Sequence, residues 1–311
     1  AHDEEIYTKT HGEIAFNEDL TSLLEDPKNY LLMPTPLGPV LLSDKTSIEE
    51  FVRKTVPNAR VSQVKTTQIG GVLNSVYLIT LQRGHGQQRI VVKKFKDWVG
   101  FKWSPLALWA LGTKSFAVLG RSRLEREYAL NQFLQSQGAS VPRILYVSPQ
   151  QSLVFKEFVE GENLAGTIKR VVSSKGRIQR ELELVKEAGR KIALAHQFGV
   201  GYGDCKPENI IVTKEGKICF VDLEQASRDG NQAWDIAEFL YYSGHYVPPL
   251  APTDKIALVT GSFLEGYIEG GGKPETIKKA ASPRYTKVFS LFTQPHVTLT
   301  ISNLCRKANQ K

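Results

Sequence analysis

One short stretch constrains this chain more than any other: residues 202–209, with the sequence Tyr-Gly-Asp-Cys-Lys-Pro-Glu-Asn. Asp204 and Asn209 stand five residues apart in it, and Asp222 follows thirteen positions after Asn209. The residues in between favour two short strands joined by a turn. A hairpin of that kind would return Asp222 to the side of Asn209. We therefore expect the three polar side chains to share one site.

This set of side chains suits phosphoryl transfer. The reaction needs cations on the phosphates and a carboxylate that orients the attacking hydroxyl, and little covalent help from the protein. Asn209 and Asp222 offer hard oxygen ligands of the kind that Mg²⁺ takes together with phosphate and water. The pattern therefore predicts a phosphotransferase.

The stretch 203–209, followed by Val221-Asp222-Leu223, resembles the catalytic and metal-binding loops of the protein-kinase superfamily, spacing included. The resemblance implies ATP as the phosphoryl donor, Asp204 as the hydroxyl-orienting base and Lys206 as a contact to the γ-phosphate. It also implies that Asn209 and Asp222 hold Mg²⁺, or Mn²⁺ in its place. Tyr202 departs from the family, which usually has histidine there.

A second part of the resemblance concerns the lysine that binds the α- and β-phosphates. Residues 90–93, Ile-Val-Val-Lys, resemble the strand that carries it, which favours Lys93. Lys94 is the competing candidate because it is adjacent. Glu127 stands where a helix glutamate pairs with that lysine in the family.

Two further stretches match the positions of nucleotide-binding segments. Gly70 and Gly71 lie where the family has its phosphate loop, but the sequence departs from GxGxxG, and a plain hairpin turn would look the same. Glu157 and Val159 belong to a stretch that resembles the hinge between the lobes, whose backbone contacts adenine.

Three residues near the motif receive structural interpretations. His196 lies on the apolar face of its predicted helix and is expected in the core. Cys205 occupies a position that is usually leucine in the family, so burial is expected rather than reactivity. Asp235 resembles the aspartate that braces the catalytic loop.

The order of predicted elements gives the fold class. We expect an α+β, bilobal protein-kinase-like fold with a β-rich N-lobe, a helical C-lobe and no long activation segment. The predicted elements are a three-stranded antiparallel meander (61–65, 76–80, 89–93), a helix (121–137), strands (144–147, 153–158), a helix (178–198), two short strands (210–212, 218–221) and helices from 233 onward. The predicted parts are an N-terminal leader or appended element (1–58), an N-lobe (59–158) with a basic insertion at about 96–120, and a C-lobe (159–311) with a basic C-terminal extension.

The absence of a long activation segment follows from one spacing. Asp235 comes only thirteen positions after Asp222, which leaves no room for a peptide platform. That resembles the atypical kinases: the RIO family, the kinase subunit of the KEOPS tRNA-modifying complex, and lipopolysaccharide-type kinases. Gln225 is RIO-like, and the short link is more like the KEOPS subunit. Lys206 departs from both, since those kinases usually carry Ser or Thr there.

Charge is unevenly distributed. Residues 1–58 hold 5 Lys/Arg and 11 Asp/Glu, net −6, and residues 59–311 hold 35 and 21, net +14. Residues 83–126 combine ten Lys/Arg with three of the four tryptophans. Cations interleaved with aromatic rings can neutralise phosphates and stack bases. The RNA-contacting residues predicted on this basis are Trp103, Lys114, Arg121 and Arg123. The alternative is a flap that docks its aromatic rings onto the lobe.

The sequence leaves the acceptor open, and the hypotheses for it belong to different functional classes. The first hypothesis is a kinase acting on RNA, with a ribose 2′-hydroxyl of tRNA as the acceptor. The second is an atypical, RIO-like Ser/Thr protein kinase that autophosphorylates. The third is an ATPase-type binding module in RNA or ribosome assembly. A small-molecule or lipid-sugar kinase is a further possibility.

The remaining expectations concern the compartment. Three cysteines form no CxxC pair, which favours a reducing compartment over a disulfide framework. The longest apolar run, 104–120, is interrupted by Lys114 and is too short for a membrane span. The acidic N-terminus is not typical of a secretory signal. We therefore expect a soluble, cytoplasmic protein without a membrane partner.

Overall fold

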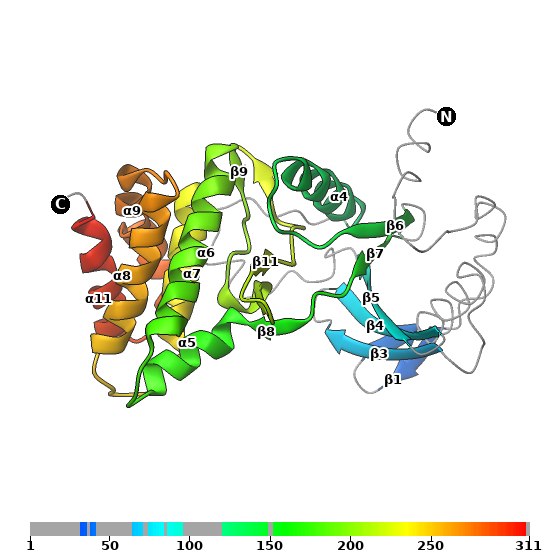
Figure 1. Ribbon diagram of the computed structural model, residues 1–311, viewed down its shortest axis with the longest axis horizontal. Helices are drawn as coiled ribbons and strands as arrows, with labels where there is room; N and C mark the ends of the chain where they lie inside the picture. Colours follow the sequence, from blue (N-terminus) through cyan, green and yellow to red (C-terminus); the bar gives the residue numbers. More distant parts are fainter. Residues whose placement is uncertain are drawn as a thin grey trace. The chain divides into compact units, whose positions relative to one another are not determined.

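The computed structural model describes residues 32–35, 38–41, 64–70, 74–83, 86–95, 120–148 and 152–308. These residues group into two units by their contacts. The first unit takes residues 1–96 and 143–158, and the second takes 97–142 and 159–311. Figure 1 shows the elements of both.

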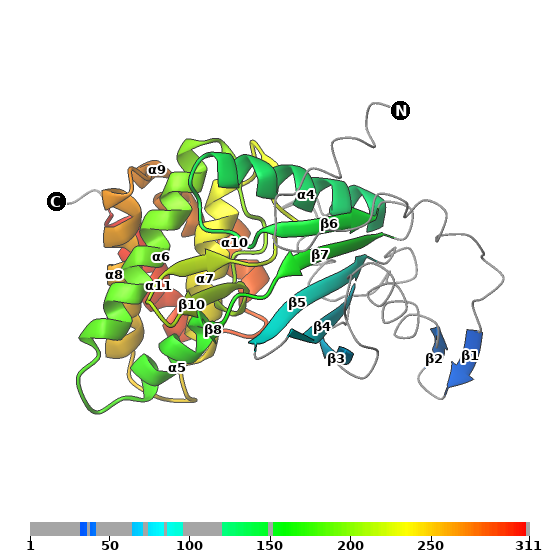
Figure 2. The ribbon, with the colours of Figure 1, turned by 45° about the vertical axis from the view of Figure 1, so that its right-hand side comes forward.

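The first unit is built on a five-stranded antiparallel sheet in the order β3-β4-β5-β7-β6 (Figure 2). Its strands are β3 (Val64–Gly70), β4 (Asn74–Arg83), β5 (Gly86–Phe95), β6 (Ile144–Ser148) and β7 (Leu153–Glu157). The β-branched and aromatic residues of β4 and β5 suit a sheet with one buried face. Ile79, Ile90 and Val92 are among its buried residues. The predicted order of three antiparallel strands is confirmed, and its first strand is Val64–Gly70, whereas the prediction placed it at 61–65.

A short hairpin precedes this sheet. Strands β1 (Leu32–Thr35) and β2 (Gly38–Leu41) pair antiparallel, with Pro34 opposite Pro39. Both lie in the predicted leader, where no strand was expected.

The second unit is largely helical. Its helices are α4 (Gly120–Ser136), α5 (Leu164–Ser173), α6 (Gln179–Gln197), α7 (Gln232–His245), α8 (Asp254–Glu269), α9 (Pro274–Ala280), α10 (Pro283–Phe289) and α11 (Pro295–Arg306). Its short strands are β8 (Gly161–Asn163), β9 (Val200–Gly201), β10 (Ile210–Thr213), β11 (Ile218–Phe220) and β12 (Ser227–Arg228), with the 3₁₀ turn η5 (Pro207–Asn209). Strand β10 pairs with both β8 and β11, and β9 pairs with β12.

Helix α4 matches the predicted helix 121–137, but by its contacts it groups with the helical unit rather than with the sheet. By the same grouping, the unit that holds the sheet ends at Phe158, which is also the last residue of the predicted N-lobe. The predicted domain bounds remain predictions. Among the helices that the structure describes, none has the length and apolarity to cross a membrane.

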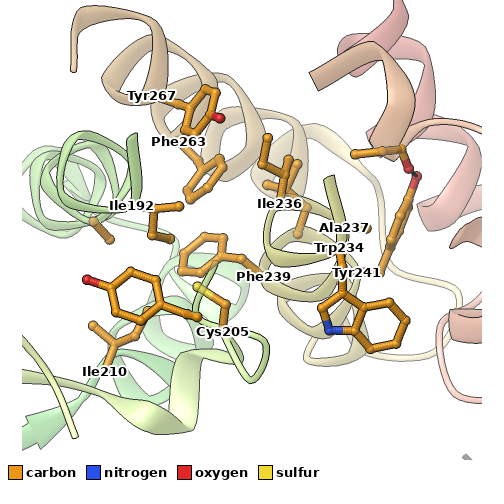
Figure 3. Packing of buried hydrophobic residues seen from close by; sticks show 14 of the residues in the cluster. Ile192, Cys205, Ile210, Trp234, Ile236, Ala237, Phe239, Tyr241, Phe263 and Tyr267 are labelled. Carbon is orange, nitrogen blue, oxygen red and sulfur yellow. Dashed lines mark hydrogen bonds between the residues drawn. The ribbon is translucent and has the colours of Figure 1, made fainter. Parts of the chain in front are cut away.

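The core of the helical unit forms around α7, which is buried on most sides. Figure 3 shows Phe239 of α7 between Ile192 of α6 and Phe263 of α8, with Cys205 beside it. The rings of Phe239 and Phe263 stack at 4.3 Å between centroids. Because α7 is packed on several faces, side chains at its start are held in fixed positions near the motif.

Helices α6 and α8 approach closely at two glycines. A Cβ atom at Gly266 would collide with the backbone oxygen of Lys186, and one at Gly189 would collide with that of Phe263. The helices therefore pack backbone to backbone at these points, which only glycine allows. Alongside this contact, Lys186 forms ion pairs with Glu265 and Glu269.

Candidate active site

The loop 202–209 connects β9 to η5 and β10. Gly203 adopts φ +74°, a left-handed conformation that favours glycine. Tyr202 turns inward, is buried, and stacks on Phe220 of β11 at 4.3 Å. Burial raises the pKa of the Tyr202 hydroxyl well above its usual value. A large aromatic ring therefore fills the position where the sequence departs from the family.

Asp235, near the start of α7, fixes the backbone of this loop. Its Oδ2 accepts a hydrogen bond from Tyr202 N at 2.7 Å, and its Oδ1 accepts one from Gly203 N at 2.7 Å. His196 Nε2 lies 2.9 Å from the same Oδ2, and His196 Nδ1 lies 2.7 Å from Tyr267 Oη. The predictions of a bracing aspartate and a core histidine fit this arrangement.

Two more side chains of α7 hold the loop, and the sequence analysis did not identify either. The Cys205 N–H donates to Glu238 Oε2 at 2.6 Å, and the Trp234 indole N–H donates to Gly203 O at 3.2 Å. Cys205 itself is fully buried, which fits the predicted structural role. Trp234 and Glu238 lie one helical turn apart, so one face of α7 supplies both contacts.

With its backbone fixed, the loop presents Asp204 and Lys206 together. Lys206 Nζ lies 3.5 Å from Asp204 Oδ1, and both side chains are partly exposed. The nearby Asp204 carboxylate raises the pKa of the Lys206 ammonium above its usual range. Lys206 is therefore a cation at neutral pH, beside a carboxylate that can accept a proton.

The predicted hairpin brings the oxygen donors to the same place. Strands β10 and β11 pair antiparallel, with Ile210 opposite Phe220, and Val221 N donates to Asn209 O at 3.1 Å. Asn209 Nδ2 donates to Asp204 O at 3.2 Å, which ties the asparagine to the loop. Asp222 follows directly after this pairing, so the hairpin prediction is confirmed.

Asp222 also belongs to a cluster of carboxylates. One oxygen each of Glu127, Asp222 and Glu224 lie within 4.8 Å of one another, and Glu224 N donates to Asp222 Oδ1 at 3.4 Å. Glu127 comes from α4, and the other two follow β11. The oxygen atoms of Asp222 and of nearby Asn209 fit a hard divalent cation such as Mg²⁺, and Glu127 and Glu224 add negative charge beside Asp222.

Tyrosines of α7 lie beside the exposed side of the loop. Burial raises the pKa of Tyr242 to about 12, with Glu238 acting in the same direction and Lys206 in the opposite one. Tyr246, the residue after α7, donates a hydrogen bond to the carboxylate of Glu208. The ring of Tyr246 is covered by Lys169 Nζ at 4.9 Å. These contacts hold the exposed Glu208 side chain, and Lys206 and Asp204 beside it are partly exposed.

Other predicted site residues lie in the first unit. Lys93 stands on β5, paired with Val76 and Val154, and its Nζ lies 4.9 Å from the centre of the Phe95 ring. Gly70 ends β3 at a register irregularity. Glu157 Oε1 accepts from Arg143 N at 2.9 Å.

Of the remaining predicted site residues, the structure describes only some. Val159 follows β7 outside any helix or strand. Gly71, Trp103 and Lys114 lie outside the described residues, as does the side chain of Arg121. The roles predicted for these residues, and for those in the first unit, remain predictions.

The prediction for Arg123 needs correction. This residue was expected on an RNA-contacting surface, but it is fully buried in α4. Its Nη1 lies 3.5 Å from Glu224 Oε1, and that carboxylate is also buried. A guanidinium in this environment is not presented to a nucleic acid. The sequence cannot reveal the pair because its members are 101 residues apart.

A separate cavity of about 530 Å³ opens between β8, α5, α6 and β10. Glu162, Arg170, Arg180 and Glu181 are among its lining residues. Among the predicted site residues that the structure describes, none lines it. It is therefore not the site that the motif predicts.

Comparison with known proteins gives one family match. The model of the lipopolysaccharide kinase (Kdo/WaaP) family matches residues 79–240, which include the loop 202–209, Asp222 and Asp235. The match covers just over half of the chain.

Curated relatives carry kinase names. KEOPS complex subunit Bud32 of Pyrococcus abyssi is 28% identical over 111 residues, 36% of this chain and 48% of that protein. The probable serine/threonine-protein kinase BUD32 homolog of Archaeoglobus fulgidus is 25% identical over 143 residues, 46% of this chain and 65% of that protein. The probable serine/threonine-protein kinase CPE1738 of Clostridium perfringens is 29% identical over 116 residues, 35% of this chain and 16% of that protein. The chain thus spans less than two thirds of each of these relatives.

Among solved structures, the complex of Rv3197 with erythromycin from Mycobacterium tuberculosis is similar at 18% identity and a TM-score of 0.35. The similarity covers 57% of this chain and 50% of that one. At this score it supports no conclusion about the chain. The expectation of an atypical kinase therefore rests on the family match and on the curated relatives, which confirm it.

Proposed function

The chain belongs to the lipopolysaccharide kinase (Kdo/WaaP) family and is an atypical, ATP-dependent kinase with a protein-kinase-like fold, and we propose that its acceptor is a serine or threonine hydroxyl of a protein, beginning with its own chain. The observation that carries the proposal is the pairing of Asp204 with Lys206 at 3.5 Å on a loop held by α7. This arrangement places a proton acceptor beside a cation, as transfer to a neutral hydroxyl requires.

In the proposed reaction Asp204 accepts a hydrogen bond from the acceptor hydroxyl and takes its proton. The acceptor oxygen then forms a bond to the γ-phosphorus of ATP, and the bond from that phosphorus to the β–γ bridging oxygen breaks, so that ADP leaves. Lys206 stabilises negative charge on the transferred group, because its raised pKa keeps it protonated. The hydrogen bonds from the loop backbone to Asp235 keep both side chains oriented throughout.

The residues that would hold the divalent cation are Asn209 and Asp222, with Glu127 and Glu224 close to Asp222. A bound Mg²⁺ would neutralise charge on the β- and γ-phosphates. Lys93 remains the proposed contact to the α- and β-phosphates. The backbone of Glu157 and Val159 is proposed to contact adenine, and Gly70 and Gly71 to lie over the phosphates.

Two features favour a protein acceptor, and a third weakens the case for RNA. Two of the curated relatives bear the name serine/threonine-protein kinase. Lys206 is also the residue type found in eukaryote-like protein kinases at this position, according to the resemblance of the motif. The correction at Arg123 removes one of the four residues on which an RNA surface was predicted.

RNA is the second candidate acceptor. The net charge of +14 over residues 59–311 favours it. Exposed cations also gather on the last helices, at Lys278, Lys279, Lys287 and Arg306. A sugar hydroxyl, as the name of the family suggests, would use the same Asp204 chemistry.

One labelling experiment separates these acceptors. The chain is incubated with γ-labelled ATP and Mg²⁺ alone, with total protein, with total RNA, and with lipopolysaccharide; the Asp204→Ala variant serves as the control. The proposal expects label on serine or threonine that resists ribonuclease, is lost with protease and is absent from Asp204→Ala. Label that survives protease and vanishes with ribonuclease would identify RNA as the acceptor instead.

A further inference from the structure

A buried ion pair connects helix α4 to the segment that carries Asp222. Arg123 Nη1 lies 3.5 Å from Glu224 Oε1, and the side chains are 0% and 5% exposed. Both residues belong to the helical unit. Taking two charges out of water is costly, and the attraction between them does not always compensate for it. A buried pair of this kind is therefore weak evidence for a role in stability alone.

The pair has close neighbours among the residues of the candidate active site. Glu127 lies one helical turn after Arg123, so the two project from the same face of α4. Glu224 is two residues after Asp222, and its N–H lies 3.4 Å from Asp222 Oδ1. Carboxylate oxygens of Glu127, Asp222 and Glu224 gather within 4.8 Å. The ion pair thus connects the two segments whose carboxylates form this cluster.

The short link in the sequence explains why such a connection is needed. Only twelve residues lie between Asp222 and Asp235, so the chain has no long activation segment that could contact α4. Three like charges gathered within 4.8 Å also repel one another. A guanidinium on α4 offsets part of that repulsion.

We propose that Arg123 and Glu224 are a positioning pair that sets Glu127 against Asp222 for phosphoryl transfer, and that this pair takes the place of contacts from an activation segment. Neither residue touches the reacting atoms in this proposal. They act through Glu127 and Asp222. The inference rests on the kinase activity and not on the identity of the acceptor.

The test uses ATP hydrolysis in the absence of any acceptor, so that it does not depend on the acceptor proposal. Arg123→Met and Glu224→Gln are each made alone and in a Glu127→Gln background. For every variant, kcat, KM for ATP and the half-saturating Mg²⁺ concentration are measured. Misplacement of a reacting group by about 1 Å can lower the rate about 100-fold. We expect a loss of that order in kcat, with a higher Mg²⁺ requirement, in the otherwise unchanged chain.

The Glu127→Gln background distinguishes positioning from folding. If the pair acts through Glu127, then removing the ion pair in the Glu127→Gln background should change kcat by less than about threefold. The reason is that effects of coupled residues are not additive. Arg126→Met is the matched control: it removes the same side chain from a partly exposed site on the same helix, and it should leave kcat and the Mg²⁺ requirement unchanged.

Two results would overturn the proposal. One is a lower melting temperature for Arg123→Met and Glu224→Gln with unchanged kcat per folded molecule and unchanged Mg²⁺ requirement. The other is an equal loss of kcat with and without the Glu127→Gln change. If Arg123→Met does not fold, Glu224→Gln decides the outcome, since it keeps the volume of the side chain and an oxygen acceptor for Arg123.

Discussion

Nε2 of His196 lies 2.9 Å from Oδ2 of Asp235, and both side chains are buried. The histidine thereby orients a carboxylate whose two oxygens each accept a backbone N–H from the loop 202–209. A single side chain of α7 thus connects the helical core to the loop that carries Asp204. Loss of the Asp235 carboxylate should affect both the stability of the chain and phosphoryl transfer.

The first prediction is that Asp235→Asn lowers both the stability of the chain and the rate of phosphoryl transfer. The amide group keeps one acceptor oxygen but turns an NH₂ toward the N–H of Tyr202 or Gly203, so that one buried donor loses its partner. An unsatisfied buried group costs about 1–3 kcal/mol. We expect the free energy of unfolding in urea to fall by that amount and kcat to fall by at least about tenfold. Asp254→Asn, at an exposed position at the start of α8, should change the stability by less than about 1 kcal/mol.

The second prediction concerns the charge of Lys206. Asp204 raises the pKa of this ammonium above its ordinary value of 10.5, so it stays protonated across about pH 6–10. Lys206→Met should therefore lower kcat about 100-fold without changing the shape of the pH profile of kcat over that range. Lys217→Met removes an exposed lysine from the nearby hairpin and should change neither. A profile that loses a titration step in Lys206→Met would contradict the assignment.

Much of the site could be predicted because its residues are close in the sequence. Asp204, Lys206 and Asn209 share one loop, and a turn sequence between two β-branched runs returns Asp222 to them. The spacing alone therefore constrains the geometry. The brace at Asp235 could be predicted as well, but only from the resemblance to the kinase superfamily.

The contacts that could not be predicted join distant segments. Arg123 and Glu224 are 101 positions apart, and Cys205 and Glu238 are 33 apart. A buried arginine looks the same in the sequence as a solvated one, so its basic surroundings led to the wrong expectation of an RNA contact. Only the packing of α4 decides between the two environments.

Helix α5 is a different case, since a signal for it exists in the sequence. Leu164, Ile168 and Val171 recur at helical spacing and are buried. Asn163 caps the helix, and its side-chain oxygen accepts from Gly166 N at 3.1 Å. The pattern predicts an amphipathic helix, but it spans only ten residues next to the hinge-like stretch and was not identified.

The third prediction concerns stability at alkaline pH. Burial raises the pKa of Tyr242 to about 12 from its ordinary value of 10.0. Because the folded state holds this proton more tightly, Tyr242 contributes stability below pH 10, and that contribution is lost as the pH rises toward about 12. Tyr242→Phe cannot titrate. We expect the free energy of unfolding of the variant to gain about 1–3 kcal/mol on the wild type between pH 9 and pH 12.

Urea denaturation at several pH values in this range measures the difference between the two chains. Other buried tyrosines titrate in both chains, so their effects cancel in the comparison. A constant difference across the range would show that Tyr242 titrates at its ordinary value.

The fourth prediction uses two glycines of α8 that differ only in their surroundings. A Cβ atom at Gly266 meets the backbone oxygen of Lys186, whereas one at Gly261 has no neighbour within 4 Å. Gly266→Ala must separate α6 from α8 and should cost about 1–3 kcal/mol. Gly261→Ala should instead stabilise the chain by about 0.5–1 kcal/mol, since alanine is the better helix former. Thermal melts of the two variants should therefore shift in opposite directions from the wild type. An unchanged or raised melting temperature for Gly266→Ala would mean that the helices are not in backbone contact there.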